Sequence, residues 1–286
     1  MPLLALFSLS ILWGSTFYLT KMLLPDFHPV SIVFFRCLFG AAALLPFFLW
    51  NKKKNDFKNL PALLLITLMS AGVPWTIMSL SIKNLDTTIT SVLNATGPII
   101  GMVISSLFLK IKIHKQEIIS VFIGFTGIVL AFFAGSSTAN EFKFSSAALF
   151  LFSVSVYSLS AVFVGKFLKD CSVYTLSFVS MIVGSVFSGF FMLGIEPMSH
   201  EALLNVKSFI LFILLGMFNS GFGNVIFYYL VKSGGAIFAL LIMYLMPFTT
   251  ILLGVFLLQE PLAPGTLLAL FFVLAGLFLS QRRKIK

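Results

Sequence analysis

The residues of this sequence that could do chemistry are polar and aromatic side chains set inside long apolar stretches. Hydroxyl and amide groups can form hydrogen bonds there, and aromatic rings can stack on a solute or contact a cation. A buried polar group needs a partner, so each one either bonds to a neighbouring segment, the commoner case, or faces a wet cavity. Their clustering in the stretches 60–82, 87–109, 206–231 and 235–258 favours several of them lining one cavity. The candidate solute-binding residues are Trp13, Ser15, Thr16, Arg36, Trp75, Ser79, Thr90, Asn94, Tyr157, Ser160, Asn219, Asn224, Tyr228 and Tyr244.

Arg36 is the one ionisable residue well inside an apolar stretch. It lies seven residues after Pro29, which places it roughly 10 Å along a helix that begins there. A guanidinium at that depth needs a partner. It could bind an anionic group of a solute, such as a carboxylate. Alternatively, it could pair with Asp86 or Glu260 or clasp backbone carbonyls near the end of the helix, and the shallow depth favours this structural role.

Cysteine and histidine are too sparse for a catalytic or metal-binding cluster. Cys37 lies in an apolar stretch and Cys171 in a basic loop, while His28, His114 and His200 fall in separate loops. The sequence therefore predicts no disulfide framework, no metal site and no cofactor.

The composition is that of a polytopic membrane protein. Of the 286 residues, 59% are hydrophobic and 10% are charged, whereas a soluble domain carries about 25% charged residues. The net charge of +10 does not indicate nucleic acid binding, because the basic residues lie in short loops between apolar stretches, where they determine topology.

Ten apolar stretches are long enough to cross a bilayer, which needs about 20 residues. Because backbone polar groups in lipid must bond within their own segment, we expect these stretches to be helices. They are residues 3–22, 30–50, 60–82, 87–109, 117–134, 144–165, 173–194, 206–231, 235–258 and 264–281.

The distribution of basic residues predicts the orientation. With the N-terminus inside, the inside loops and the C-terminal tail hold fourteen of the 19 Lys and Arg residues, and the outside loops hold four. This bias predicts that both termini are cytoplasmic.

The chain contains an internal repeat. Advancing the sequence by 149 positions superimposes matching residues without a gap: Gly72 on Gly221, Lys83 on Lys232, Pro98 on Pro247, Leu109 on Leu258 and Gly127 on Gly276. Five helices per half is an odd number, so the second half must be inverted relative to the first, as in many transporters. We therefore predict an all-α membrane protein with ten transmembrane helices in an inverted 5+5 repeat. The first half is 1–134, the linker is 135–143 and the second half is 144–286.

Pro98 and Pro247 occupy matching positions in the two halves. Each proline frees a carbonyl group one turn earlier and can kink its helix. The pair could act as hinges, one for each gate, or form static kinks tolerated by neighbouring helices. The sequence weighs these two interpretations evenly.

Five short motifs resemble the EamA-type family of the drug/metabolite transporter superfamily. They are Leu12-Trp13-Gly14-Ser15-Thr16-Phe17, Pro29 with Phe34-Phe35-Arg36, Asn94-Ala95-Thr96-Gly97-Pro98, Leu257-Leu258-Gln259-Glu260-Pro261 and Leu274-Ala275-Gly276. One departure concerns the end of the fourth helix, where this family often carries a glutamate and this sequence reads Leu109-Lys110-Ile111-Lys112. The resemblance implies a secondary transporter of small metabolites in the cytoplasmic membrane.

We therefore expect an exporter of small metabolites, with amino acids as the leading substrates, that works by alternating access. No Asp or Glu falls near the middle of a predicted span. Proton-driven transporters usually carry such an acid, so its absence favours facilitated export, although carboxylates at helix ends leave proton coupling open.

Other functions stay open at this stage. A proton-coupled exporter of drugs or other small solutes is the nearest alternative, and a membrane-embedded lipid enzyme or a scaffold without transport is a more distant one. The expected partners are a small-molecule substrate and the lipid bilayer, with no nucleic acid. Ten helices can form a complete pathway in one chain, so we expect a monomer and leave a dimer open.

Overall fold

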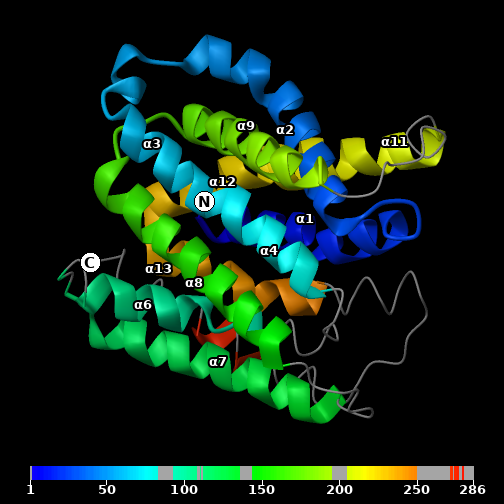
Figure 1. Ribbon diagram of the computed structural model, residues 1–286. Helices are drawn as coiled ribbons and strands as arrows, with labels where there is room; N and C mark the ends of the chain where they lie inside the picture. The colour runs from blue at the N-terminus through cyan, green and yellow to red at the C-terminus, as the bar shows by residue number, and fades with distance from the viewer. Residues whose placement is uncertain are drawn as a thin grey trace.

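The protein is a bundle of helices in its computed structural model (Figure 1). The structure describes residues 2–82, 93–107, 110, 112–135, 144–194, 205–249, 271–272, 274–276 and 279. Every regular element within these residues is a helix, and none of them forms a strand.

The elements before residue 140 follow the predicted apolar stretches. In chain order they are α1 (Pro2–Leu23), α2 (Pro29–Asn51), the 3-10 turn η1 (Lys54–Phe57), α3 (Leu60–Thr67), the π-helical segment η2 (Leu68–Gly72), α4 (Val73–Ile82), α6 (Gly97–Leu107) and α7 (Lys115–Gly135).

The elements after residue 140 repeat this order in outline. They are α8 (Phe144–Phe167), α9 (Val173–Met192), α11 (Val206–Ile213), the π-helical segment η3 (Leu214–Phe222), α12 (Gly223–Gly234) and α13 (Ala236–Leu240). A turn at Leu241 follows α13, and the chain is helical again over 242–249.

Polar caps begin several of these helices. The Asn59 side chain accepts a hydrogen bond from the Ala62 N–H at the start of α3, and Asn205 accepts one from Lys207 at the start of α11. Ser172 caps α9 in the same way. Each cap satisfies a backbone donor that the helix leaves unpaired and so determines where the helix begins.

Six of the described helical segments are long and apolar enough to cross a membrane. They are Pro2–Thr20, Pro29–Asn51, Leu60–Ser81, Phe144–Phe167, Val173–Met192 and Val206–Gly234. Within the predicted spans 87–109 and 235–258 the described helices are shorter, and most of 264–281 lies outside the described residues. Ten spans in an inverted repeat therefore stay a prediction.

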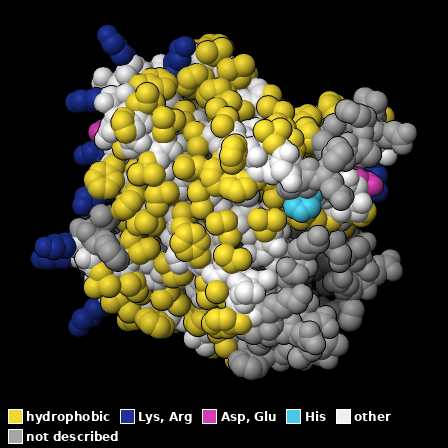
Figure 2. All heavy atoms as spheres, in the orientation of Figure 1, with side chains coloured by type: hydrophobic (Ala, Val, Ile, Leu, Met, Phe, Trp, Pro, Cys, Tyr) yellow, Lys and Arg dark blue, Asp and Glu magenta, His cyan; other side chains and the backbone are white. Residues whose placement is uncertain are grey.

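The surface supports a membrane setting. Large apolar side chains lie fully outward, including Leu4, Phe190 and Val186 at 74%, 73% and 69% exposure. Figure 2 shows hydrophobic side chains spread over much of the described part of the visible face, with most of its Lys and Arg along the left edge. The C-terminal ends of α2 and α8 and the N-terminal end of α7 lie on that side in Figure 1. We call this the lysine-rich end. An exposed apolar surface of this extent is stable in lipid and unstable in water.

The two π-helical segments interrupt two of the spans at related positions. The Val73 N–H bonds to the Leu68 carbonyl and the Gly223 N–H to the Phe218 carbonyl, five residues back in each case. Shifting 68–72 forward by the 149-residue offset gives 217–221, which falls inside η3. Such π segments often occur at functional sites, and both lie next to candidate residues.

Glycines allow α2 to pack directly on η3. A Cβ atom added to Gly40 would lie 2.9 Å from the Gly216 carbonyl oxygen, and one added to Gly216 would lie 2.9 Å from the Arg36 carbonyl oxygen. The two backbones therefore touch, which requires residues without side chains. This contact brings Arg36 next to η3.

Candidate functional site

The first-helix motif bonds to η3. The Trp13 Nε1 donates to the Asn219 carbonyl oxygen at 2.9 Å. The Asn219 Nδ2 donates to Ser15 Oγ and Thr16 Oγ1, both at 3.0 Å. These four candidate residues are thus brought together, and the bonds they make join two helices. The glycine at position 223 makes room for the Trp13 indole, because a Cβ there would lie 2.6 Å from Nε1.

Arg36 lies between the two π-containing helices. Its Nε donates to Ser220 Oγ of η3 at 2.7 Å, and its Cζ lies 4.4 Å from the centre of the Trp75 ring in α4. The Ser220 hydroxyl donates in turn to the Leu215 carbonyl oxygen at 2.9 Å, so it is oriented to accept from Arg36. A guanidinium over a tryptophan face gains cation–π energy.

The predicted acidic partners of Arg36, Asp86 and Glu260, lie outside the described residues. Within the part of the chain that is described, Arg36 forms no ion pair, and its terminal nitrogens make no hydrogen bond. The side chain is partly exposed. Its two NH₂ groups can therefore donate hydrogen bonds to further acceptors, and their planar arrangement matches the two oxygens of a carboxylate.

Tyr228 joins α12 to η2 and α9. Its hydroxyl lies 2.6 Å from Ser70 Oγ and 2.6 Å from Ser180 Oγ, and the two serine oxygens are 3.2 Å apart. All three side chains are buried. The cluster connects the π segment of the first half with two helices of the second half.

An aromatic group packs beside this cluster. The ring centroids of Trp13 and Phe227 are 5.3 Å apart, and so are those of Tyr157 and Phe227. The Tyr157 hydroxyl is buried and makes no hydrogen bond to the described protein. A buried hydroxyl without a partner is unusual, which marks this position as one where a polar group of a solute could bond.

The remaining candidates are more scattered. Ser79 and Ser160 donate to carbonyl oxygens of their own helices. Asn94 reaches the Met246 Sδ at 4.0 Å, and the Tyr244 hydroxyl donates to the Val121 carbonyl oxygen at 3.0 Å. Asn224 donates to the Ser220 carbonyl oxygen. Thr90 lies outside the described residues.

Sequence reasoning missed Ser70, Ser180 and Ser220. A serine in an apolar helix can bond to its own backbone, as Ser79 does, and nothing in the sequence separates the two cases. The one usable signal was for Ser220, which follows Asn219 directly in a stretch already singled out.

The two prolines occupy different settings. Pro98 lies in the first turn of α6, directly after a turn at Ala95 and Thr96. Its missing N–H costs nothing there, so the helix is interrupted before this proline and not kinked at it. Pro247 lies inside the helical residues 242–249. A hinge role for either residue stays a prediction.

A buried carboxylate joins two loops at the lysine-rich end. Asp56 of η1 accepts hydrogen bonds from the Ser172 N–H at 2.9 Å, from Thr175 Oγ1 at 2.6 Å and from the Lys53 N–H at 3.0 Å. Lys232 of α12 donates to the Cys171 carbonyl oxygen in the same region. Burial, with Asp56 nearby, raises the pKa of the Cys171 thiol to about 12, so this cysteine is not a nucleophile near neutral pH.

The chain matches one protein family over nearly its whole length. The EamA-like transporter family matches residues 1–133 and again residues 144–281. This protein belongs to the EamA-like transporter family. Membership agrees with the motifs and makes it a transmembrane protein of a transporter family, with the helical, apolar structure described above.

Relatives with transporter names cover most of this EamA-like protein. An "Uncharacterized transporter" of Archaeoglobus fulgidus is 25% identical over 95% of each chain. The "Uncharacterized inner membrane transporter YedA" of Escherichia coli K12 is 26% identical over 93% of this chain and 86% of its own. A solved crystal structure with 13% identity covers 99% of this chain with a TM-score of 0.81, which shows a shared fold.

Groups that could bind a metal are absent from the part of the chain the structure describes: no three His, Cys, Asp or Glu residues gather there. The site instead offers hydrogen-bonding groups, aromatic faces and one cation. Groups of these kinds suit a small polar solute.

Proposed function

We propose that this protein is a ten-helix secondary transporter that exports small metabolites across the cytoplasmic membrane by alternating access, with amino acids as the leading substrates. The observation that carries the proposal is the position of Arg36, between Trp75 of α4 and Ser220 of η3. A charge within a span is costly and is retained where it has a function.

A carboxylate is the solute group that suits this site best. Two NH₂ groups of one guanidinium can hold both carboxylate oxygens at once. The Trp75 ring beneath the guanidinium and the Ser220 hydroxyl at its Nε restrict how Arg36 can turn. We infer that Trp13 and Tyr157, which pack together with Phe227 in this structure, contact an apolar or aromatic side chain of the solute when the bundle opens.

The matching features of the two halves support alternating access. The family match falls in two stretches, 1–133 and 144–281, and a π segment lies at corresponding positions in both. In transporters built from inverted repeats the substrate site lies where the repeats meet. Two contacts join the halves: Arg36 of the first half bonds to Ser220 of the second, and Tyr228 of the second half bonds to Ser70 of the first.

The Asp56 contacts are suited to a gate. They join the loop after α2 to the start of α9, 116 and 119 residues further along the chain, at the lysine-rich end. The excess of basic residues at this end supports a cytoplasmic location for it. We infer that these bonds hold the cytoplasmic side closed and break when the site opens inward.

Counterflow in proteoliposomes tests the proposal. Purified protein would be reconstituted and assayed with a panel of radiolabelled amino acids, first at equal pH on both sides and then with a pH step. Exchange of neutral amino acids that ignores the pH step supports a facilitator, and exchange that follows the step supports proton coupling. If no amino acid or other candidate metabolite moves in either direction, the proposed function is wrong.

Variants at position 36 test the carboxylate site. A hydrogen bond to a charged group contributes about 1.5–3 kcal/mol, so Arg36→Ala should weaken the apparent affinity roughly 10- to 150-fold. Arg36→Lys retains the charge without the paired NH₂ groups and should retain part of the affinity. Lys169→Ala is the control, because it removes an exposed cation at the lysine-rich end. Equal transport by Arg36→Ala and the control would assign Arg36 a structural role.

A further inference from the structure

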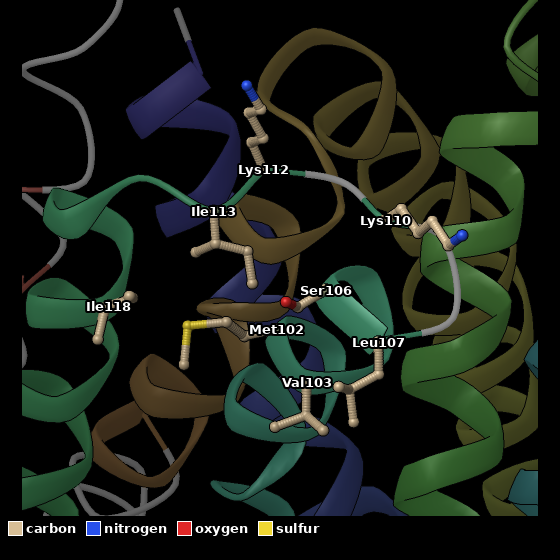
Figure 3. A pocket seen from close by; sticks show the side chains of 8 residues that line it. All are labelled: Met102, Val103, Ser106, Leu107, Lys110, Lys112, Ile113 and Ile118. Atoms are coloured by element: carbon tan, nitrogen blue, oxygen red, sulfur yellow. The ribbon is translucent and has the colours of Figure 1, made fainter.

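A groove of about 550 Å³ lies between the C-terminal end of α6 and the start of α7 (Figure 3). Its apolar wall is formed by Met102, Val103 and Leu107 of α6 together with Ile113 and Ile118. None of the candidate substrate-binding residues lines it. The groove is therefore separate from the region around Arg36.

The groove adjoins an exposed apolar surface of the kind that a bilayer covers. Leu107 and Val103 are 69% and 45% exposed, and the adjoining Ile119 and Phe122 of α7 are 50% and 53% exposed. No polar side chain interrupts this surface among these four residues. An occupant with a hydrocarbon chain could enter from the lipid without crossing water.

Positive charge stands at one end of the groove. Lys110 and Lys112 line its rim, and Figure 3 shows both side chains pointing away from the apolar wall. The Ser106 hydroxyl lies between the lysines and the wall. Lys110 has a φ of 51°, a left-handed conformation that is uncommon for a residue with a Cβ.

We propose that this groove binds an anionic phospholipid. One acyl chain would lie along Met102, Val103, Leu107 and Ile118, and the phosphate would lie near Lys110 and Lys112 within reach of Ser106. Two interactions retain lipids at membrane proteins: an acyl chain is buried against apolar side chains, and the phosphate pairs with basic groups. A zwitterionic lipid would bury its acyl chain equally well but would gain little from pairing with the lysines.

The position of the groove favours lipid over substrate. A transported metabolite would have to leave the bundle interior to reach α6 and α7 from outside, whereas a phospholipid is already there. Lys112 shortly precedes α7, whose N-terminal end lies at the lysine-rich end (Figure 1). In the proposal, this is where the lipid headgroup meets water. The leaflet concerned follows from the proposed orientation; the binding itself does not depend on it.

Native mass spectrometry of the purified full chain tests the proposal. The protein would be released from detergent after incubation with phosphatidylglycerol or phosphatidylcholine, and bound lipid would be counted. We expect the unmodified protein to retain phosphatidylglycerol in preference to phosphatidylcholine. The double variant K110Q/K112Q should bind phosphatidylglycerol roughly 30-fold less tightly, since each basic residue near an anionic lipid contributes about a fivefold effect.

Two further variants separate the groove from general surface charge. K166Q/K169Q removes two exposed lysines near the end of α8 and should leave phosphatidylglycerol binding unchanged. K110R/K112R retains the charge and should retain the lipid. Equal loss in K110Q/K112Q and K166Q/K169Q, unchanged binding in K110Q/K112Q, or equal retention of both lipids by the unmodified protein would each overturn the proposal. The substituted side chains are exposed, so folding, checked by size-exclusion chromatography, should be unaffected.

Discussion

Replacing Gly223 with alanine tests the contact between α1 and α12. The added methyl would lie 2.6 Å from the Trp13 Nε1 and 3.2 Å from its Cδ1. Trp13 cannot turn away freely, because its Nε1 is bonded to the Asn219 carbonyl oxygen. The indole must therefore shift and lose that bond, or the two helices must move apart.

The expected effect is a net loss of stability. Alanine is favoured over glycine inside a helix by about 1 kcal/mol. Against this, overpacking costs about 1–3 kcal/mol, and losing the Trp13 hydrogen bond costs about 1 kcal/mol more. Gly223→Ala should therefore destabilise the protein by about 1–3 kcal/mol, which lowers the melting temperature by roughly 3–10 °C.

Gly165→Ala is the matched control. It is the same substitution within α8, where the nearest atom to the new methyl would be the Val231 Cγ1 at 3.8 Å, an ordinary contact. This variant should melt at or above the temperature of the unmodified protein. A thiol-reactive dye in detergent suits the assay, because Cys37 and Cys171 are both buried until the protein unfolds.

A double-mutant cycle with Trp13→Phe completes the test. Phenylalanine lacks the Nε1 atom and is smaller, so Gly223→Ala should cost less in that background, by about 0.5 kcal/mol or more. If Gly223→Ala melts together with Gly165→Ala, or if the two substitutions are additive, then the indole is not fixed against α12 and the reasoning fails.

Three other substitutions or reagents probe the remaining contacts. Asp56→Ala should lower the free energy of unfolding by about 2–4 kcal/mol, because the Ser172 N–H and the Thr175 hydroxyl lose their carboxylate acceptor. Thermal melting measures this loss, with the exposed Asp170→Ala as the control. Equal melting curves for the two variants would contradict the prediction. Tyr228→Phe should lower the free energy of unfolding by about 1 kcal/mol, because it removes two short hydrogen bonds. The control Tyr229→Phe, at an exposed position, should leave the melting temperature unchanged in the same assay. The pKa of Cys171 is raised to about 12, so its thiolate is scarce at pH 8. A maleimide should therefore label the folded protein slowly and the protein unfolded in SDS quickly. Fast labelling of the folded form would be inconsistent with the burial described.

Much of the helical layout could be predicted from the sequence, because it depends on composition and chain punctuation. Apolar runs of about 20 residues become helices in lipid whatever their details. The caps Asn59 and Asn205 were not singled out from the sequence, although their side chains accept backbone N–H groups at the starts of α3 and α11. The 149-residue offset was read from residues such as Gly72 and Gly221, and both fall in π-helical turns.

The partners of individual polar residues could not be predicted in the same way. From the sequence, Arg36 could pair with Asp86 or Glu260, clasp backbone carbonyls or bind an anionic group of a solute, and no pattern selects among these partners. Among the residues described, Arg36 contacts a serine of η3 and a tryptophan of α4, and both contacts depend on how α2 packs on these two elements. The packing of α2 on η3 depends in turn on Gly40 and Gly216. The sequence does not show which helix a glycine in an apolar run will contact.

Pro98 shows how local and global patterns compete. The apolar run 87–109 reads as one continuous helix, while a proline is best tolerated in the first turn of a helix, where its missing N–H costs nothing. The described chain turns at Ala95 and Thr96 and begins α6 at Gly97. The local backbone preference therefore prevails over the continuous hydrophobic pattern.

The two π segments also determine how relatives of this protein should be aligned and drawn. A π turn holds one residue more than an α turn, so every side chain beyond it is rotated by about 100° from its place on an ideal helical wheel. A wheel drawn through 60–82 would therefore assign Trp75 and Ser79 to the wrong faces relative to Leu63. A one-residue deletion within 68–72 would leave an unbroken α-helix that points Trp75 away from Arg36. Gaps of a single residue at this place and at 214–222 are thus changes of site geometry and not loop-length variation.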